Sequence, residues 1–168
     1  MINKKTSSQY IIIKKSPIHS NGIYAKKDIP KNTKIIEYVG KKIASSESDK
    51  AIKRDYNNYK RNKDLGEVYL FELNKDYDID GNYSYNTARF INHSCNPNCK
   101  YKYEKGKIWI VSIRKIKKGE ELSFDYDFDL EDYENYPCKC GSKNCIGFIV
   151  GKKYRKRLQQ LIKNRCSK

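Results

Sequence analysis

The amino-acid sequence predicts a mainly β domain with short helices, and three observations support this class. Short runs rich in β-branched and aromatic residues recur along the chain, and glycine or proline separates them. A highly charged stretch with few breakers, residues 45–63, suggests an internal helix. The length of 168 residues suits one domain with its own core.

The strands that we expect are short and separated by turns. Pro30 and Gly40 bound one of them, and residues 78–81 should end another strand in a turn. The expected strands are residues 10–13, 34–40, 67–73 and 108–113.

The predicted helix within residues 45–63 has a candidate start and a candidate buried face. Ser46 or Ser48 could cap its N-terminus. Four residues are spaced to share one face of the helix: Ala51, Ile52, Tyr56 and Tyr59.

The charge of the chain is strongly positive, with a formal net charge of +16. This excess favours an anionic neighbour such as nucleic acid. An AT-rich genome would also produce much Lys, Asn, Ile and Tyr, so weak nucleic-acid contact and composition bias stay open as explanations.

One segment is acidic and could attract a cationic peptide, although we expect its outer part, residues 129–134, to be a solvated loop. Residues 120–134 contain no basic residue. Their eight acidic residues are Glu120, Glu121, Asp125, Asp127, Asp129, Glu131, Asp132 and Glu134.

The sequence contains no apolar run near the roughly 18 residues that a membrane-spanning helix needs. No apolar signal core follows Met1. We therefore expect a soluble intracellular protein without a membrane contact. In such a reducing compartment, six cysteines favour a metal site over disulfides.

Three cysteines are closely spaced near the C-terminus. Cys138, Cys140 and Cys145 form a C-x-C-x4-C array in which Gly141 permits a tight return. Thiolates at this spacing suit three corners of a tetrahedral zinc site. The fourth ligand must come from another part of the chain.

A dense polar cluster lies in residues 86–99, where Phe90 and Ile91 precede Asn92, His93 and Ser94. If buried, these three polar side chains need hydrogen-bond partners. A buried polar loop beside a possible metal-binding thiol predicts a small-molecule site.

The same residues, 86–99, closely resemble the RFINHSC-x-PNC signature of SET-domain protein-lysine methyltransferases with a post-SET zinc motif. Residues 19–25 resemble the first cofactor loop of that family, 67–73 its Y-x-F strand and 121–126 its closing E-E-L-T-Y/F-D-Y motif. Members of the trithorax type, or generic bacterial, archaeal or viral members, are similar to this chain.

The resemblance has two departures, because Ser20 and Tyr85 stand where the family has glycine. It implies small curved sheets around a pseudoknot over residues 9–132, with a variable insert at about 45–66. It also implies a post-SET zinc segment over residues 134–150. Residues 151–168 are then a basic C-terminal tail, where Leu158, Leu161 and Ile162 are spaced for a surface helix.

The resemblance further implies the cofactor and the metal ligands. The cofactor would be S-adenosyl-L-methionine, and Cys95 would be the fourth zinc ligand, with Cys99 or His93 as alternatives. The implied cofactor-binding residues are His19, Asn21, Gly22, Tyr24, Tyr69, Arg89, Asn92, His93 and Phe148.

Methyl transfer would then occur in an aromatic channel formed by Tyr69, Phe124 and Tyr126. Tyr126 matches the second aromatic residue of the closing motif and is the candidate catalytic residue. Phe124 stands where the family has Tyr or Phe, and the smaller side chain implies room for di- or trimethylation.

The implied activity is protein-lysine N-methylation of a basic tail, which could belong to a histone, a histone-like protein or another basic protein. The substrate would dock as an added β-strand. The alternative is a non-catalytic, zinc-containing basic module that binds nucleic acid or chromatin. Retention of Tyr69, Asn92, His93 and Tyr126 favours the enzyme.

Overall fold

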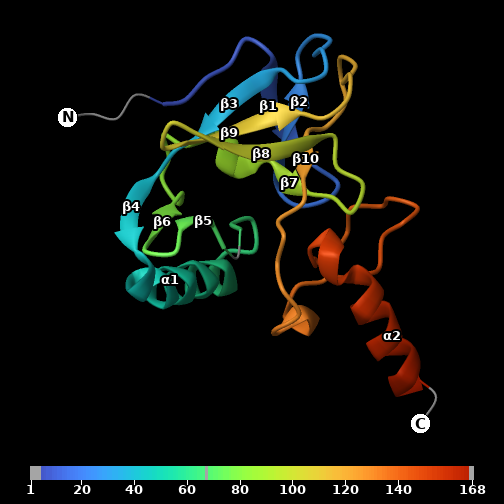
Figure 1. The fold of residues 1–168 in the computed structure, drawn as a ribbon. Coiled ribbons are helices and arrows are strands. Elements are labelled where there is room, and N and C mark those ends of the chain that lie inside the picture. The colour runs from blue at the N-terminus through green and yellow to red at the C-terminus, as the bar shows by residue number, and fades with distance from the viewer. Residues whose placement is uncertain (1–4, 67, 167–168) are drawn as a thin grey trace.

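The computed structural model describes residues 5–66 and 68–166, which form small β-sheets and two α-helices (Figure 1). The helices are α1 (Ser48–Arg61) and α2 (Arg155–Cys166). The strands are β1 (Ile11–Lys15), β2 (Asn21–Ala25), β3 (Lys34–Tyr38), β4 (Lys41–Ala44), β5 (Leu70–Asn74), β6 (Tyr77–Asp80), β7 (Asn92–His93), β8 (Cys99–Glu104), β9 (Lys107–Ser112) and β10 (Ser123–Phe124). Short 3-10 helices are η1 (Ser45–Glu47), η2 (Thr87–Phe90), η3 (Tyr133–Asn135) and η4 (Lys152–Tyr154).

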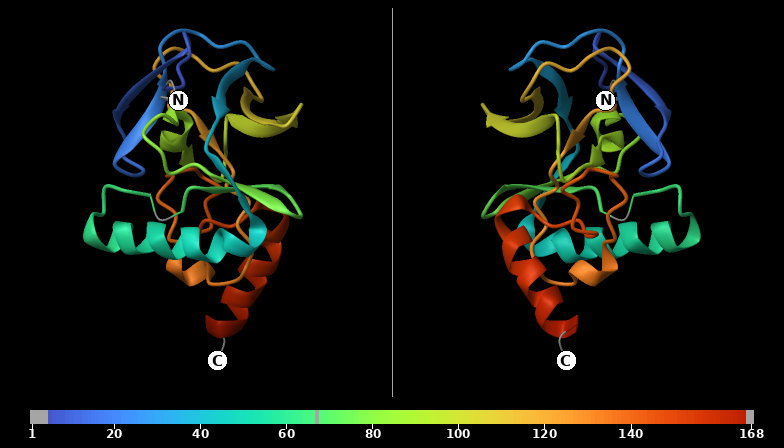
Figure 2. Two further views of the ribbon diagram at one scale, coloured as in Figure 1. Left: turned by 90° about the vertical axis from the view of Figure 1, so that its left-hand side faces the viewer. Right: turned by 90° about the vertical axis from the view of Figure 1, so that its right-hand side faces the viewer.

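The strands pair in four small sheets, in the orders β1-β2, β3-β9-β8, β4-β6-β5 and β10-β7. All pairs are antiparallel except β7 with β10, which is parallel. Both helices lie toward the same end of the molecule, and β1-β2 and β3-β9-β8 lie toward the other (Figures 1 and 2). The predicted fold class, mainly β with short helices, is therefore confirmed.

The core is built largely from isoleucines, because β-branched side chains suit the strands that carry them. Ile108 and Ile110 on the central strand β9 are almost fully buried, as is Ile23 on β2. Ile91 after η2 and Leu122 before β10 join the same cluster. The sheets and the polar segment 86–99 therefore share one core.

The predicted strands at 10–13, 34–40 and 108–113 are confirmed as β1, β3 and β9. The strand expected at 67–73 begins at Leu70, and residue 67 lies outside the described residues. Sequence analysis did not predict β2, β4, β7, β8 or β10 as strands. Strand β8 alternates Lys, Tyr and Glu and, among the described residues, pairs with β9 alone as an edge strand, so it lacks the apolar run that marked β9.

The predicted internal helix is confirmed as α1, but its expected cap is wrong. Glu47 occupies the N-cap position and makes no side-chain cap. The Ser48 hydroxyl instead donates to the Asp78 carboxylate on β6.

The buried face of α1 also differs from the expected one, because Ser48, Ala51 and Asp55 are buried whereas Tyr56 is exposed. A polar face faces the protein here, since β6 and its turn offer carboxylate and amide partners. The apolar spacing of the helix did not reveal this.

Asp55 attaches α1 to the chain that enters β5. Its Oδ1 accepts hydrogen bonds from Arg54 and from Asn82 Nδ2 at 2.7 Å, and its Oδ2 accepts one from the Tyr69 backbone N–H at 3.2 Å. The Arg54 guanidinium also bonds both oxygens of Asp80, at 2.7 and 3.0 Å. The variable segment thereby fixes the backbone of Tyr69.

Residues 121–126 are held on both sides by hydrogen bonds. On one side the Leu122 N–H donates to the Ile23 carbonyl on β2 at 2.7 Å. On the other side β10 pairs with β7, and the Ser94 N–H donates to the Phe124 carbonyl at 3.2 Å. Two distant segments thus meet where the sequence predicted a polar site.

Within the described residues, neither helix has the length and apolar character to cross a membrane.

Asp55→Ala should lower the free energy of unfolding by about 2–4 kcal/mol, because it removes a buried carboxylate and leaves the Tyr69 N–H and the Asn82 amide without this acceptor. Urea denaturation measures this change. The control is Asp49→Ala on the exposed face of the same helix, which should change the free energy by less than about 0.5 kcal/mol. Equal effects of the two variants would contradict this account of Asp55.

Candidate active site and metal centre

Two cavities meet beside β7 and β10. The first has a volume of about 150 Å³ and is lined by segments that lie far apart in the sequence. They include residues 18–20 before β2 with the first residue of β2, the loop after α1, η2 with β7, and the segment of the C-terminal cysteines. Members of the segment 19–25, which resembles the family's first cofactor loop, and of the segment 86–99 therefore line the same cavity.

The second cavity also has a volume of about 150 Å³, and its lining is mostly aromatic. Phe71, Tyr101, Tyr103 and Phe124 contribute rings to it. The two cavities share five lining residues: Val68, Tyr69, Arg89, Tyr126 and Phe128. The two cavities therefore have a common wall.

Most of the sequence-predicted cofactor residues lie together. Those that line the first cavity are His19, Asn21, Tyr69, Arg89, Asn92 and His93. The two predicted channel tyrosines, Tyr69 and Tyr126, line both cavities, and Phe124 lines the second.

Gly22, Tyr24 and Phe148 are not among the residues that line the first cavity. A Cβ on Gly22 would lie 2.3 Å from Glu121 Oε1, so this glycine allows close approach to a carboxylate. The Tyr24 hydroxyl donates to Glu121 Oε2 at 3.0 Å. Phe148 packs edge-on against Tyr133, with ring centroids 5.0 Å apart.

Glu121 is a site residue that sequence analysis did not single out. Its Oε1 accepts hydrogen bonds from Asn92 Nδ2 at 2.9 Å and from Ser16 Oγ at 2.7 Å. Burial, together with Glu121, raises the pKa of Tyr24. Glu121 therefore fixes the Asn92 amide at the cavity wall, and its place in the closing motif was the available signal.

His93 is buried and neutral. Burial, with a smaller contribution from Arg155, lowers its pKa to about 3. The Tyr126 backbone N–H donates to His93 Nδ1 at 3.2 Å, so the ring proton resides on Nε2. That Nε2 lies 3.6 Å from Cys95 Sγ. In this tautomer His93 donates toward the sulfur, which disfavours its being a metal ligand.

Tyr126 lies beside the predicted cofactor residues. Its hydroxyl donates to the Ile91 carbonyl at 3.0 Å, and its ring centroid lies 5.4 Å from that of His93. The ring of Phe124 is 5.0 Å away. Burial raises the pKa of Tyr126, so its phenol stays protonated at neutral pH. The aromatic wall and the polar loop are thus in contact.

Arg89 offers an unused donor at the shared wall. Its Nη1 donates to Asn82 Oδ1 at 3.1 Å, and its guanidinium lies 5.6 Å from the ring centroid of Tyr69. Among the described residues, Arg89 Nε is buried and has no hydrogen-bond partner. Such an orphaned donor beside a cavity fits a bound polar ligand.

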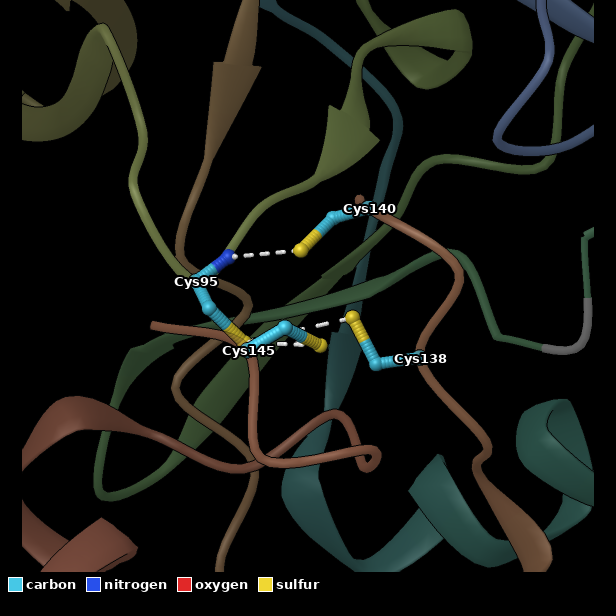
Figure 3. Close-up of side chains that lie close together, drawn as sticks. All are labelled: Cys95, Cys138, Cys140 and Cys145. Carbon is cyan, nitrogen blue, oxygen red and sulfur yellow. Dashed lines mark hydrogen bonds between the residues drawn. The ribbon is translucent and has the colours of Figure 1, made fainter. Parts of the chain in front are cut away.

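Four thiols converge near the first cavity, and Figure 3 shows their side chains pointing toward one another. The sulfur atoms of Cys95, Cys138, Cys140 and Cys145 all lie within 4.8 Å of one another. Cys95 Sγ is 3.9 Å from the sulfurs of Cys138 and of Cys145. Zn–S bonds of about 2.3 Å in a tetrahedron separate the sulfurs by about 3.8 Å. The group therefore fits a zinc ion.

The backbone around the thiols also suits a thiolate cluster. The Cys95 N–H donates to Cys140 Sγ, and the Gly147 N–H donates to Cys145 Sγ, both at 3.4 Å. Burial opposes ionisation of Cys140, but hydrogen bonds from Ser142 and Cys95 lower its pKa to about 6. Gly141 has a φ of +66°, as the tight return requires.

Cys99 lies away from this group, in the hydrophobic core. It is 1% exposed, and burial raises its pKa to about 12. Cys99 was one alternative for the fourth ligand, and the convergence of thiols favours Cys95 over it.

The fold and the site together define a SET domain. A model of the family described as "SET domain" matches residues 20–127, and the chain belongs to this family. The matched segment contains residues 20–25 of the predicted cofactor loop, residues 86–99 and the closing motif.

Particular relatives carry histone-methyltransferase names. Histone-lysine N-methyltransferase trithorax of Drosophila virilis is 40% identical over 150 residues, which cover 87% of this chain and 4% of that protein. Human histone-lysine N-methyltransferase 2D is 39% identical over 140 residues, covering 80% of this chain and 2% of its own length. The H3 lysine-4 specific enzyme of Schizosaccharomyces pombe is 41% identical over 138 residues, covering 80% and 14%. The chain thus spans a small part of each relative.

The purified protein should carry about one zinc ion per chain, as a closed four-thiolate site requires. Cys140→Ser should lower the zinc content at least about tenfold under dialysis against a chelator, because one thiolate is lost. Elemental analysis measures the content. Cys99→Ala is the matched control and should retain the metal. Full zinc content in Cys140→Ser would exclude this site.

Proposed function

We propose that this chain transfers a methyl group from S-adenosyl-L-methionine to a lysine side chain in the basic tail of a histone or histone-like protein. One observation carries the proposal: the cavity that Asn92 and His93 line and the cavity that Phe71 and Phe124 line share a wall that contains Tyr69 and Tyr126. Relatives named histone-lysine N-methyltransferases support the same reaction. Such a substrate would place the protein on chromatin.

The cofactor would occupy the first cavity, where it supplies an electrophilic methyl group on a sulfonium centre. Asn92, held by Glu121, and the backbone of His93 would position it. Arg89 Nε has a free donor for its polar groups. Fixed partners of this kind lower the barrier by orientation rather than by acid or base chemistry.

The lysine would enter through the second cavity and meet the cofactor at the shared wall. An unperturbed lysine has a pKa near 10.4, so its neutral form at pH 7 costs about 4.6 kcal/mol. An aromatic lining disfavours the ammonium form and lowers this cost. The carbonyl of Ile91 and the hydroxyl of Tyr126 are polar groups near the wall that could orient the amine.

A zinc ion on the four thiols would join Cys95, in the polar loop, to the C-terminal segment. That segment also lines the first cavity, through Tyr136, Cys138 and Ile149. The proposed role of zinc is therefore structural, with all four positions filled by thiolates.

The second cavity suits a cationic peptide. Glu72 and Asp127 are among its lining residues. Strand β5, which also lines it, is the edge strand of β4-β6-β5, where an extended peptide could add a strand. The positive charge of the chain favours the alternative of a non-catalytic nucleic-acid-binding module, and the next experiment separates the two.

Radiolabelled S-adenosylmethionine should label histone H3 or another basic protein when incubated with the purified chain. Tyr126→Phe should lower kcat/KM at least about 100-fold, because it removes the hydroxyl that orients the reacting amine. The control, Tyr77→Phe, changes an exposed tyrosine that lines neither cavity and should leave the rate unchanged. If wild-type protein labels no substrate but binds duplex DNA tightly, the non-catalytic module is supported instead.

Wild-type protein should produce di- and trimethyl-lysine, because Phe124 lines the second cavity without a hydroxyl. Phe124→Tyr adds a group that can hold water or the amine, so we expect mainly monomethyl product and at least about a tenfold lower rate for the later steps. Mass spectrometry of a modified peptide measures the ratio. Only monomethyl product from both proteins would refute this role.

A further inference from the structure

Helix α2 follows the cysteine segment and lies beyond residues 20–127, where the family match ends. Sequence analysis treated it as part of a basic tail with a surface helix. In Figure 1 its first turn lies close to the C-terminal loop, and its far end projects away from the domain. Arg155 and Leu158 are 9% and 0% exposed, whereas Lys156 and Arg157 are exposed. The helix is therefore docked through its N-terminal turn.

Arg155 makes the polar contacts of this docking, and they reach three separate segments. Its Nη1 donates to the Cys95 carbonyl and its Nη2 to Asp125 Oδ2, both at 2.6 Å. Its Nε donates to the Val150 carbonyl at 3.0 Å. The three nitrogens of one guanidinium thus each have a protein acceptor.

Two of these acceptors belong to the two parts of the site, the metal-binding thiols and the closing motif. Cys95 directs its sulfur toward the other three thiols while its carbonyl accepts from Arg155. Asp125 precedes Tyr126 and also accepts from the Lys152 N–H at 3.0 Å. A single side chain therefore connects the metal-binding loop, the closing motif and the segment that follows Cys145.

We propose that Arg155 is a positioning residue that holds the C-terminal cysteine segment closed over the cofactor cavity. The inference rests on the proposed function for its catalytic consequence. Its structural part, retention of the metal and order in residues 138–150, does not depend on catalysis. Helix α2 would then stabilise the site through the contacts of its first residue, Arg155.

The chemistry of arginine is essential to this role. A planar guanidinium can donate to a carboxylate and to two carbonyls at fixed angles, and lysine presents one nitrogen at a single point. The part-buried Arg155–Asp125 ion pair also differs from the pair that Arg165, further along α2, forms with Glu134 of η3. Both members of that pair are more than half exposed, so it contributes little.

The test compares Arg155→Gln, Arg155→Lys and the exposed control Arg157→Gln in the full chain loaded with Zn²⁺. A chromogenic chelator measures zinc release, hydrogen exchange measures order in residues 138–150, and steady-state kinetics gives kcat and the KM for S-adenosylmethionine. For Arg155→Gln we expect about tenfold or greater increases in zinc release, exchange rate and KM. Its kcat should change less than about threefold, because Tyr126 keeps its own hydrogen bonds.

Arg155→Lys should give intermediate values, and Arg157→Gln should match wild type within about twofold. Release, exchange and KM within twofold of wild type in both Arg155 variants would overturn the proposal. A fall in kcat with unchanged KM would also overturn it, since closure over the cofactor would not be the affected step. If Arg155→Gln does not fold, Arg155→Lys decides.

The proposed function can fail separately. Wild-type protein that methylates nothing refutes the activity, while the zinc-release rates still test the positioning role of Arg155. Wild-type protein that retains no zinc refutes the metal site, and hydrogen exchange in residues 138–150 then decides the role of Arg155.

Discussion

The pairing of two short segments, residues 92–98 and 121–126, is the constraint on which the site depends. Strands β7 and β10 contribute only two residues each. The Asn98 side chain extends the pairing, because its Nδ2 donates to the Glu121 carbonyl at 2.8 Å and its Oδ1 accepts from the Ser123 N–H at 2.9 Å. A buried amide with both of its polar atoms satisfied acts here as an additional backbone partner. Without it, the parallel pair would be too short to fix the register.

With this register, side chains close together in the sequence contact different parts of the site. Asn92 contacts Glu121 at the wall of the first cavity, and His93 contacts Tyr126. Cys95 reaches the other thiols. Asn92 and His93 point to opposite sides because they are successive residues of strand β7, and Cys95 lies in the bend that follows the strand. The proposed cofactor site, channel and metal centre are therefore mechanically coupled through one short loop, and a shift of its backbone would disturb all three.

The parts of the site that sequence could predict are those carried by contiguous motifs. In the C-x-C-x4-C array and in residues 86–99, the residue types and their spacing are enough to indicate the chemistry. The structure brings the thiols of the two motifs together. The contacts of Glu121, which lies in the closing motif, and of Arg155 could not be predicted in this way. Their partners Ser16 and Cys95 are 105 and 60 positions away in the sequence. Nothing in the sequence near Arg155 distinguishes it from the other Lys and Arg residues, which number 36 in all. The fold shows the same limit, since α1 was predicted but its polar buried face depends on partners on β6 and at Tyr69 and Asn82.

The departures from the family pattern show which property of a motif the fold preserves. Ser20 replaces a glycine of the first cofactor loop, yet its φ is +41°, in the region that glycine favours. Ser20 thus adopts a conformation that glycine favours despite its side chain, and it lines the first cavity. Tyr85 replaces another glycine and stacks on Tyr83, with ring centroids 5.2 Å apart. The fold therefore tolerates a changed residue where the backbone path survives, and this explains how the loop can diverge in sequence while it still presents Asn21 and Asn92 to the same cavity.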